Sequence, residues 1–244
     1  MKVKVLVAAH KQFPMPADPV YMPVLVGAVK NYKAGIAYQR DDEGDNISAK
    51  NPYYSELTGV YWAWKNLKDV DAIGLVHYRR YFYVSKPHDL DHVAKGADYE
   101  HFLADHDVIV PKKRNYYIES NYDHYIHAHP AEPLDKTRDI IADAYPDYLP
   151  AFDMMMKRRS AHMFNMFVMK RPAFESYCEF VFGVLSKLEG QIDISGYSVQ
   201  DQRVYGYISE RLLDVWLYTT KQDFVEIPWG QIGGEAVIKK GYNL

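Results

Sequence analysis

Cysteine is nearly absent from this sequence, and so are other features that mark particular protein classes. The single Cys178 among 244 residues excludes a disulfide scaffold. No run of about 18 apolar residues occurs, so a transmembrane span is not expected. The net charge of -3 shows no basic excess, which argues against a nucleic-acid partner. An apolar fraction of 48% excludes intrinsic disorder.

Signatures of several enzyme classes are also missing. The sequence contains no Gly-x-Gly-x-x-Gly fingerprint, no Walker loop, no Gly-x-Ser-x-Gly elbow and no His-Glu-x-x-His pair. Binding of NAD is therefore not expected. Low cysteine use fits a reducing compartment, and the apolar run Val3–Ala9 is short and interrupted by Lys4, unlike a secretory signal. We accordingly expect a cytoplasmic protein.

Aromatic residues are plentiful instead: 22 Tyr, 10 Phe and 4 Trp make up 15% of the chain. Tyrosine combines an apolar ring with a polar tip, which suits surfaces that bind sugars and nucleotides and equally suits ordinary cores. Trp64 and Trp216 fall on apolar helical faces and are assigned to the core. Tyr78 and its neighbours lie among charged residues, which favours a ligand-binding surface there.

Apolar runs alternate with amphipathic stretches along the chain. The runs Val3–Ala9, 72–76, 106–111 and 164–169 predict buried strands, and residues 51–66, 120–148, 172–189 and 198–220 predict helices. Residues 13–23, with four prolines, and the polar residues 40–51 predict loops. This order favours an α/β fold with a mainly parallel sheet and a helical C-terminal part. No linker interrupts the chain, so we expect one domain over residues 1–244.

The strongest candidate site is the segment His77-Tyr78-Arg79-Arg80, directly after the apolar run 72–76. In open α/β sheets, ligands bind beyond the carboxyl ends of the strands. Guanidinium groups match phosphate oxygens bidentately, so two adjacent arginines at a strand end indicate a diphosphate-binding site. The alternative is that these arginines form structural ion pairs with Asp or Glu elsewhere in the chain.

Two other clusters have the residue types of cation sites. The acidic loop 41–46, followed by Ser48, offers the carboxylate oxygens that Mg²⁺ or Mn²⁺ prefers, although the same residues are typical of a solvated turn. His124, His127 and His129 have the residue type of a metal site, but neither a second group of ligands nor a cysteine pair accompanies them. Surface histidines are the simpler explanation.

The last candidate group consists of Asp193, Asp201, Arg203 and Glu210, in and before the predicted C-terminal helix. Arg203 and Glu210 are seven residues apart and therefore share a helical face, with Gly206 between them. A glycine at this position allows a ligand or another backbone to approach closely. A surface ion pair of Glu210 is the competing interpretation.

Several segments of the chain resemble a bacterial protein family. They are Asp45-Asn46-Ile47-Ser48, residues 54–66 (YSELTGVYWAWKN), residues 74–82 (GLVHYRRYF), residues 165–169 (NMFVM) and residues 203–213 (RVYGYISERLL). The family was long catalogued as a domain of unknown function. Its members are found in capsular and exopolysaccharide gene clusters and are regarded as glycosyltransferases, some of them galactofuranosyltransferases. The resemblance covers nearly the whole chain.

The resemblance implies a GT-A-like, Rossmann-like domain that transfers a sugar from a UDP-sugar to a glycan acceptor. That fold normally carries an Asp-x-Asp motif, which holds a metal on the donor diphosphate, whereas this chain has His-Tyr-Arg-Arg after the strand. We therefore predict that Arg79 and Arg80 supply the charge that a metal supplies elsewhere. If Mn²⁺ or Mg²⁺ binds, His77 or Asp45 is its expected ligand.

The family reading also implies roles for individual residues. Inverting transfer needs a carboxylate that removes the proton of the acceptor hydroxyl. Glu210 is the predicted base, and Asp193 and Asp201 are the other candidates. The residues expected at the donor and its diphosphate are His10, Lys11, Asp45, Asn46, Glu56, His77, Arg79, Arg80 and Arg203. Asn165 and Tyr78 are expected on the acceptor side.

Two rival functions remain open at this point. A non-catalytic nucleotide-sugar or glycan-binding protein is compatible with the same fold, and a metal-dependent hydrolase is compatible with the three histidines. A lipid-linked acceptor, as the family implies, places the protein at the inner face of the cytoplasmic membrane. The short basic clusters 112–114 and 157–159 are candidates for contact with anionic lipid, and plain solvated surface is the alternative.

Overall fold

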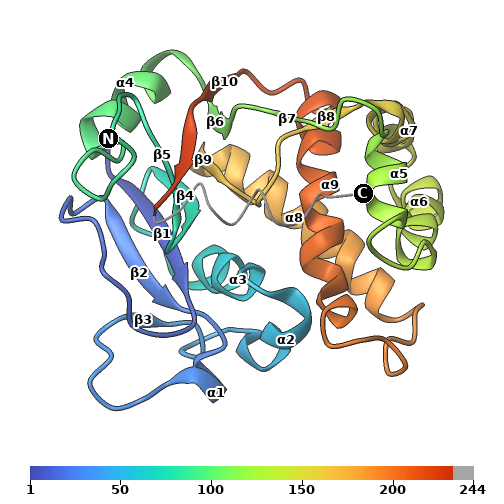
Figure 1. Cartoon of the computed structure of the whole chain (residues 1–244), viewed down its shortest axis with the longest axis horizontal. Helices are drawn as coiled ribbons and strands as arrows, with labels where there is room; N and C mark the ends of the chain where they lie inside the picture. The colour runs from blue at the N-terminus through green and yellow to red at the C-terminus, as the bar shows by residue number, and fades with distance from the viewer. Residues whose placement is uncertain (233–244) are drawn as a thin grey trace.

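The computed structural model describes residues 1–232, and most of its strands form one mixed sheet (Figure 1). The strand order is β10-β6-β9-β4-β1-β2-β3. The bounds are β1 (Val3–Ala9), β2 (Tyr21–Leu25), β3 (Gln39–Arg40), β4 (Ala72–His77), β6 (Val108–Pro111), β9 (Phe167–Lys170) and β10 (Phe224–Ile227). Along this path, only β9 runs antiparallel to its neighbours, β4 and β6. The predicted α/β class with a mainly parallel sheet is confirmed.

The direction of the strands decides where a ligand site can lie. Strands β1 and β4 are parallel, and β6 is parallel to β4 because both are antiparallel to β9. The carboxyl ends of β1, β4 and β6 therefore meet at the same edge of the sheet. At that edge β5 (Arg80–Phe82) folds back on β4 and pairs with β11 (Trp229–Gln231). Strands β7 (Arg114–Asn115) and β8 (Ser160–Ala161) form a separate pair.

Helices cover both faces of the sheet, and the larger group lies on one side of it (Figure 1). The helices are α1 (Ala28–Asn31), α2 (Asn51–Tyr54), α3 (Leu57–Asn66), α4 (Gly96–Asp105), α5 (Asn121–Ile126), α6 (Glu132–Ala144), α7 (Leu149–Lys157), α8 (Arg171–Glu189) and α9 (Val204–Thr219), with a 3₁₀ turn η3 (Asp201–Arg203) before the last. Within residues 1–232, no helix is long and apolar enough to cross a bilayer.

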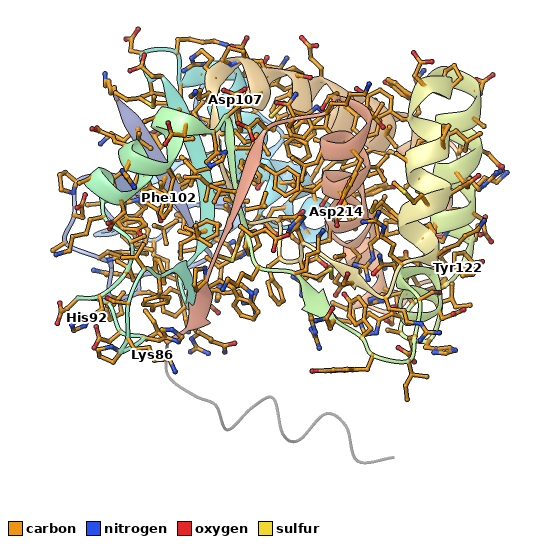
Figure 2. All side chains as sticks on the ribbon, turned by 90° about the horizontal axis from the view of Figure 1, so that it is seen from above. Lys86, His92, Phe102, Asp107, Tyr122 and Asp214 are labelled. Atoms are coloured by element: carbon orange, nitrogen blue, oxygen red, sulfur yellow. The ribbon has the colours of Figure 1, made fainter. Side chains whose placement is uncertain are left out.

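The core consists of two clusters, and β1 contributes alternate residues to them. Leu6 packs with the helices α3 and α6 to α9, whereas Val5 and Val7 pack on the other face, against α4. Cys178 and Trp216 are fully buried in the larger cluster, as predicted. Figure 2 shows α9 in the middle of the molecule, where Asp214 is enclosed by neighbouring side chains.

Three local predictions are wrong. The helix expected over residues 51–66 breaks at Ser55, whose φ of 51° no α-helix accommodates, and it becomes α2 and α3. The loop expected over 13–23 ends earlier, because Pro23 lies inside β2. A proline is tolerated there since β2 pairs only with β1 at that residue and joins β3 from Val24 onward. The last helix begins at Val204 rather than at 198.

Candidate functional site

A polar cleft with a volume of about 400 Å³ lies at the carboxyl ends of β1 and β4. This is the place where open α/β sheets bind their ligands. It is lined by Ala8, Ala9, His10, Val26, Asn51, Pro52, Ser55, Glu56, His77, Tyr78 and Arg203. Five of these residues, His10, Glu56, His77, Tyr78 and Arg203, are among those predicted from the sequence at the donor or acceptor. The tertiary fold therefore brings together residues from five separate segments.

The break between α2 and α3 places Ser55 and Glu56 at the cleft. Arg203 donates from Nε to Ser55 Oγ at 3.2 Å, which joins α2 to the start of α9. Gly206 makes this approach possible, because a Cβ atom at that position would lie 3.2 Å from Ser55 Oγ and 3.3 Å from Ser55 Cβ. The close approach predicted at Gly206 is thus made by another part of the chain. No sequence signal marked Ser55.

Beneath the cleft, a buried amide holds the Glu56 carboxylate. Asn165 Nδ2 donates to Glu56 Oε1 at 2.7 Å, and Ser209 Oγ donates to Asn165 Oδ1 at 3.0 Å. Asn165, predicted on the acceptor side, is 1% exposed and does not itself line the cleft. Phe164 and Asn165 both have positive φ, 76° and 52°. Two consecutive strained residues persist only where the surroundings fix them, and such residues gather at functional sites.

His77 lies against the same strained turn. Its Nε2 donates to the Phe164 carbonyl at 2.5 Å. Burial lowers the pKa of His77, the Glu56 carboxylate opposes this shift, and the Arg80 cation adds to it. Because burial is the largest cause, we expect a neutral imidazole at neutral pH. Its Nε2–H then serves as a fixed hydrogen-bond donor, while Nδ1 keeps its lone pair.

Arg80 and Glu210 form a second layer behind the cleft. The Arg80 guanidinium lies 4.0 Å from the centroid of the Phe164 ring, and its Nε is buried without a hydrogen-bond partner among residues 1–232. Burial lowers the pKa of Arg80, against the opposing effects of Glu210 and Glu56. Burial raises the pKa of Glu210, although Arg211 Nη1 donates to its carboxylate at 3.0 Å. Arg80 is thus a partly buried cation whose Nε has unused donor capacity.

The structure separates the two arginines that the sequence places side by side. Strand β4 turns back at Tyr78 and Arg79, so that His77 pairs with Arg80 across a hairpin. Arg79 is exposed and lines a neighbouring hollow with Phe13, not the cleft. The expectation that both arginines face one cleft is therefore wrong, because a tight turn directs successive side chains in different directions.

An aromatic group borders the cleft on the side of Tyr78. The Phe13 and Tyr78 rings stack with their centroids 3.8 Å apart. The His10 ring meets both of them edge-on, with centroids 5.5 Å away. Lys11 lies over the Phe13 ring at 5.3 Å and does not line the cleft. These rings offer a flat surface on which a base or a sugar can stack.

The remaining predicted donor residues lie in a turn and do not line the cleft. Asp45 accepts from the Tyr61 hydroxyl at 3.4 Å, and its backbone N–H donates to Asn66 at 3.2 Å. Asn46 donates to the Gly44 carbonyl at 2.8 Å. The acidic loop therefore has a structural role in these contacts.

The other carboxylate candidates are also engaged away from the cleft. Asp193 accepts from the Ser195 backbone N–H at 2.9 Å and is exposed. Asp201 accepts from His129 at 3.0 Å. Neither lines the cleft.

The side chains around the cleft offer few oxygen ligands for a divalent cation. Glu56 is the one carboxylate among the residues that line it. Over residues 1–232, no group of three or more His, Cys, Asp and Glu side chains is arranged to hold a metal ion. His124 and His127 instead share the Glu119 carboxylate at 2.9 and 2.8 Å.

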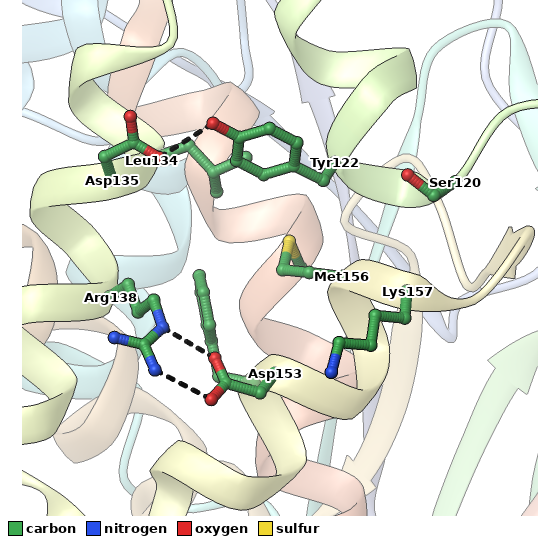
Figure 3. Close-up of a pocket in the computed structure, with 9 residues that line it drawn as sticks. Ser120, Tyr122, Leu134, Asp135, Arg138, Asp153, Met156 and Lys157 are labelled. Atoms are coloured by element: carbon green, nitrogen blue, oxygen red, sulfur yellow. Dashed lines mark hydrogen bonds and ion pairs between the residues drawn. The ribbon is translucent and has the colours of Figure 1, made fainter.

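A second hollow, of about 410 Å³, lies between α5, α6 and α7 (Figure 3). Leu134, Phe152 and Met156 make it largely apolar. At its rim Arg138 binds Asp153 through two hydrogen bonds of 2.7 and 2.8 Å. None of the predicted site residues lines this hollow, so we assign the candidate site to the cleft at the strand ends.

Residues 4–222 match the family described as a domain of unknown function, DUF4422. The chain belongs to this family. No curated protein matches the chain. Among solved structures, the chain is similar to the apo structure of WbbM, a bifunctional glycosyltransferase, with 28% identity and a TM-score of 0.83. The match covers 96% of this chain and 46% of WbbM, so the chain spans about half the length of that protein.

Proposed function

We propose that this chain is a glycosyltransferase that moves a sugar from a nucleoside diphosphate sugar to a glycan acceptor. The observation that carries the proposal is the cleft at the ends of β1 and β4. It combines the Glu56 carboxylate, the Arg203 cation and an aromatic border at Tyr78. The similarity to WbbM over 96% of the chain supports the same activity.

Two arginines are suited to the departing diphosphate. Arg203 lines the cleft, and only its Nε is used by Ser55. Arg80 lies behind it with a buried, unpartnered Nε. A cation that is already oriented stabilises charge that develops on a leaving group, without the need to reorganise solvent. In this proposal Arg203 replaces Arg79 as a diphosphate-binding residue. Arg80 keeps the diphosphate-binding role that was predicted from the sequence.

The acceptor hydroxyl needs a base, and two carboxylates compete for this role. Glu56 lines the cleft and is oriented by Asn165 at 2.7 Å. Glu210, the base predicted from the sequence, does not line the cleft and is paired with Arg211. Because a general base must reach the proton that it removes, we favour Glu56 as the base. Glu210 then balances the charge of Arg80.

Finer features of the activity are proposed from the family resemblance. We propose a UDP-sugar as the donor, with UDP-galactofuranose as the first to test, and inversion at the transferred carbon on a GT-A-like fold. A capsular or exopolysaccharide glycan carried on a lipid is the proposed acceptor. His10 and Tyr78 are suited to stack against the uracil or ribose, because their rings border the cleft.

A thermal-shift screen of UDP-sugars, followed by turnover assays, tests this function. A donor that binds only the folded state raises the melting temperature, by an amount that grows with its concentration. We expect such a shift, together with transfer or slow donor hydrolysis that persists in EDTA. Binding without any turnover would support a non-catalytic sugar-nucleotide protein instead. Complete loss of turnover in EDTA that Mn²⁺ reverses would contradict the assignment of the diphosphate to arginines alone.

A further inference from the structure

Two basic segments that are distant in the sequence lie side by side in the structure. Strand β7 pairs antiparallel with β8, so that Arg114 lies opposite Ala161 (Figure 1). We call residues 112–120 and 154–161 together the β7–β8 tip. They carry six basic side chains and one carboxylate, Glu119. The pairing therefore concentrates positive charge that the sequence divides between two short clusters.

Neighbouring acids neutralise only part of the basic excess at the tip, because among its basic side chains Lys113 pairs with Glu226 at 3.7 Å. Glu119 accepts hydrogen bonds from two histidines, and Asp153 is occupied by Arg138. Lys112, Lys157 and Arg159 are exposed. These three side chains are consequently available to an anionic partner.

Two large apolar side chains project from the same tip. Tyr117 is 83% exposed and Ile118 is 85% exposed. They lie in a three-residue turn, closed by a 2.7 Å hydrogen bond from the Ile118 N–H to the Tyr116 carbonyl, in which Tyr117 has a φ of 59°. The turn is anchored to the opposite segment, because the Tyr116 N–H donates to the Arg159 carbonyl at 2.8 Å. The fold thus holds an aromatic and an aliphatic side chain in water.

The tip and the cleft lie at the same edge of the sheet. The segment 112–120 follows the carboxyl end of β6, which is parallel to β1 and β4. From β8, the chain reaches Phe164 and Asn165 after only two intervening residues. Both residues belong to the turn that supports Glu56 and His77. A partner bound at the tip would therefore contact a segment that lies only a few residues from the turn supporting the proposed catalytic groups.

We propose that the β7–β8 tip is a docking surface for a bilayer that contains anionic lipid. Tyr117 and Ile118 enter the headgroup region, and Lys112, Lys157 and Arg159 face the lipid phosphates. Apolar side chains ringed by basic ones bind such surfaces through combined burial and electrostatic attraction. The docking itself is independent of the proposed function. The further idea that the same bilayer carries the acceptor rests on the proposed function.

Co-sedimentation with vesicles tests the docking. The whole chain is mixed with vesicles of phosphatidylcholine alone or with added phosphatidylglycerol, at low and at high salt. We expect binding to the anionic vesicles that weakens as salt increases. The double variant Lys157→Gln/Arg159→Gln should bind roughly 30-fold more weakly, about fivefold for each cation removed. The variant Tyr117→Ser/Ile118→Ser should lose about tenfold, because it removes the inserted apolar surface.

Matched control variants distinguish a specific effect of the tip from a general effect of removing positive charge or apolar surface. Lys33→Gln/Lys187→Gln removes the same charge from other exposed sites, and Val199→Ser removes an apolar side chain that is 85% exposed elsewhere. Both should bind vesicles like the unaltered protein. Equal loss in the controls, unchanged binding of the tip variants, or no binding to anionic vesicles would overturn the proposal. UDP-sugar binding, measured by thermal shift, should be unaffected in every tip variant, so this test and that of the proposed function fail independently.

Discussion

The strand-end cleft and the hollow between α5, α6 and α7 have nearly the same volume, about 400 and 410 Å³, and opposite chemistry. In the strand-end cleft, Glu56 and Arg203 are held by buried polar groups and by strained backbone. In the helical hollow, the floor is apolar and the charges at the rim, Arg138 and Asp153, satisfy each other. Volume does not distinguish a reactive site from a gap between helices. Oriented, incompletely paired charge does.

The largest effect should come from removing the carboxylate that the cleft displays. Glu56→Gln keeps the side-chain size and an oxygen that can accept from Asn165, but it cannot take a proton from an acceptor hydroxyl. We expect kcat to fall by about 10²- to 10⁴-fold, the contribution of a general base, with UDP affinity little changed. Steady-state kinetics and nucleotide titration measure these quantities.

Glu210→Gln is the matched variant for this test. It should reduce kcat much less, because Glu210 is paired with Arg211 behind the cleft. The reverse outcome would identify Glu210 as the base. In that case Glu56→Gln would show near-normal turnover and Glu210→Gln a large loss.

A smaller effect is expected from replacing a buried asparagine in each of the two regions. Asn165 supports Glu56, and Asn121 donates to the Met155 carbonyl at 2.7 Å in the helical region. Asn165→Ala and Asn121→Ala should each lower the free energy of unfolding by about 1–3 kcal/mol, because buried partners lose their hydrogen bonds. Denaturant titration measures this loss.

Only the substitution beneath the cleft should also affect the reaction. Asn165→Ala releases Glu56, and a misplaced catalytic group costs roughly 10²-fold in rate. Asn121→Ala should leave kcat near that of the unaltered protein. Similar kcat losses in both variants would mean that Asn165 acts through general stability and not by orienting Glu56.

The smallest effect is expected at the rim of the helical hollow. Arg138→Gln breaks the ion pair with Asp153 seen in Figure 3. Exposed pairs contribute about 0.2–1 kcal/mol, and the bidentate geometry places this one toward the upper end of that range. We expect a small decrease in the melting temperature and unchanged turnover, as measured by calorimetry and by the transfer assay. A clear loss of turnover would show that the helical hollow takes part in the reaction and would remove the contrast between the two regions.

Much of the architecture could be predicted from local patterns. The bounds of Val3–Ala9 agree with the observed strand, and the predicted helix over residues 172–189 corresponds to α8. Continuous apolar runs and 3.6-residue periodicity are local properties of the sequence, so they indicate strands and helices whatever the tertiary packing is. The break at Ser55 carried no such signal, because that strained conformation depends on contacts with Arg203 and Gly206 in α9.

The candidate site was only partly predictable for the same reason. The chemistry-bearing types His77, Glu56 and Arg203 were recognisable, and the fold gathers them into one cleft. The strand-end rule could not tell that Arg79 and Arg80 diverge, since β5 folds back on β4 and pairs with β11, a strand that is distant in the sequence. Asn165 looked like a ligand-binding residue, and its burial under Glu56 became evident only from its hydrogen bonds with Glu56 and with Ser209 of α9.

The amino-acid sequence by itself determined the fold class, the family and the kinds of side chain at hand, because these depend on composition, periodicity and short motifs. The tertiary structure alone decided which carboxylate faces the cleft, which arginine lines it, and that two modest basic clusters form a single tip with Tyr117 and Ile118. Those outcomes depend on contacts between residues far apart in the chain, and burial and pairing of such groups are properties of the packed molecule.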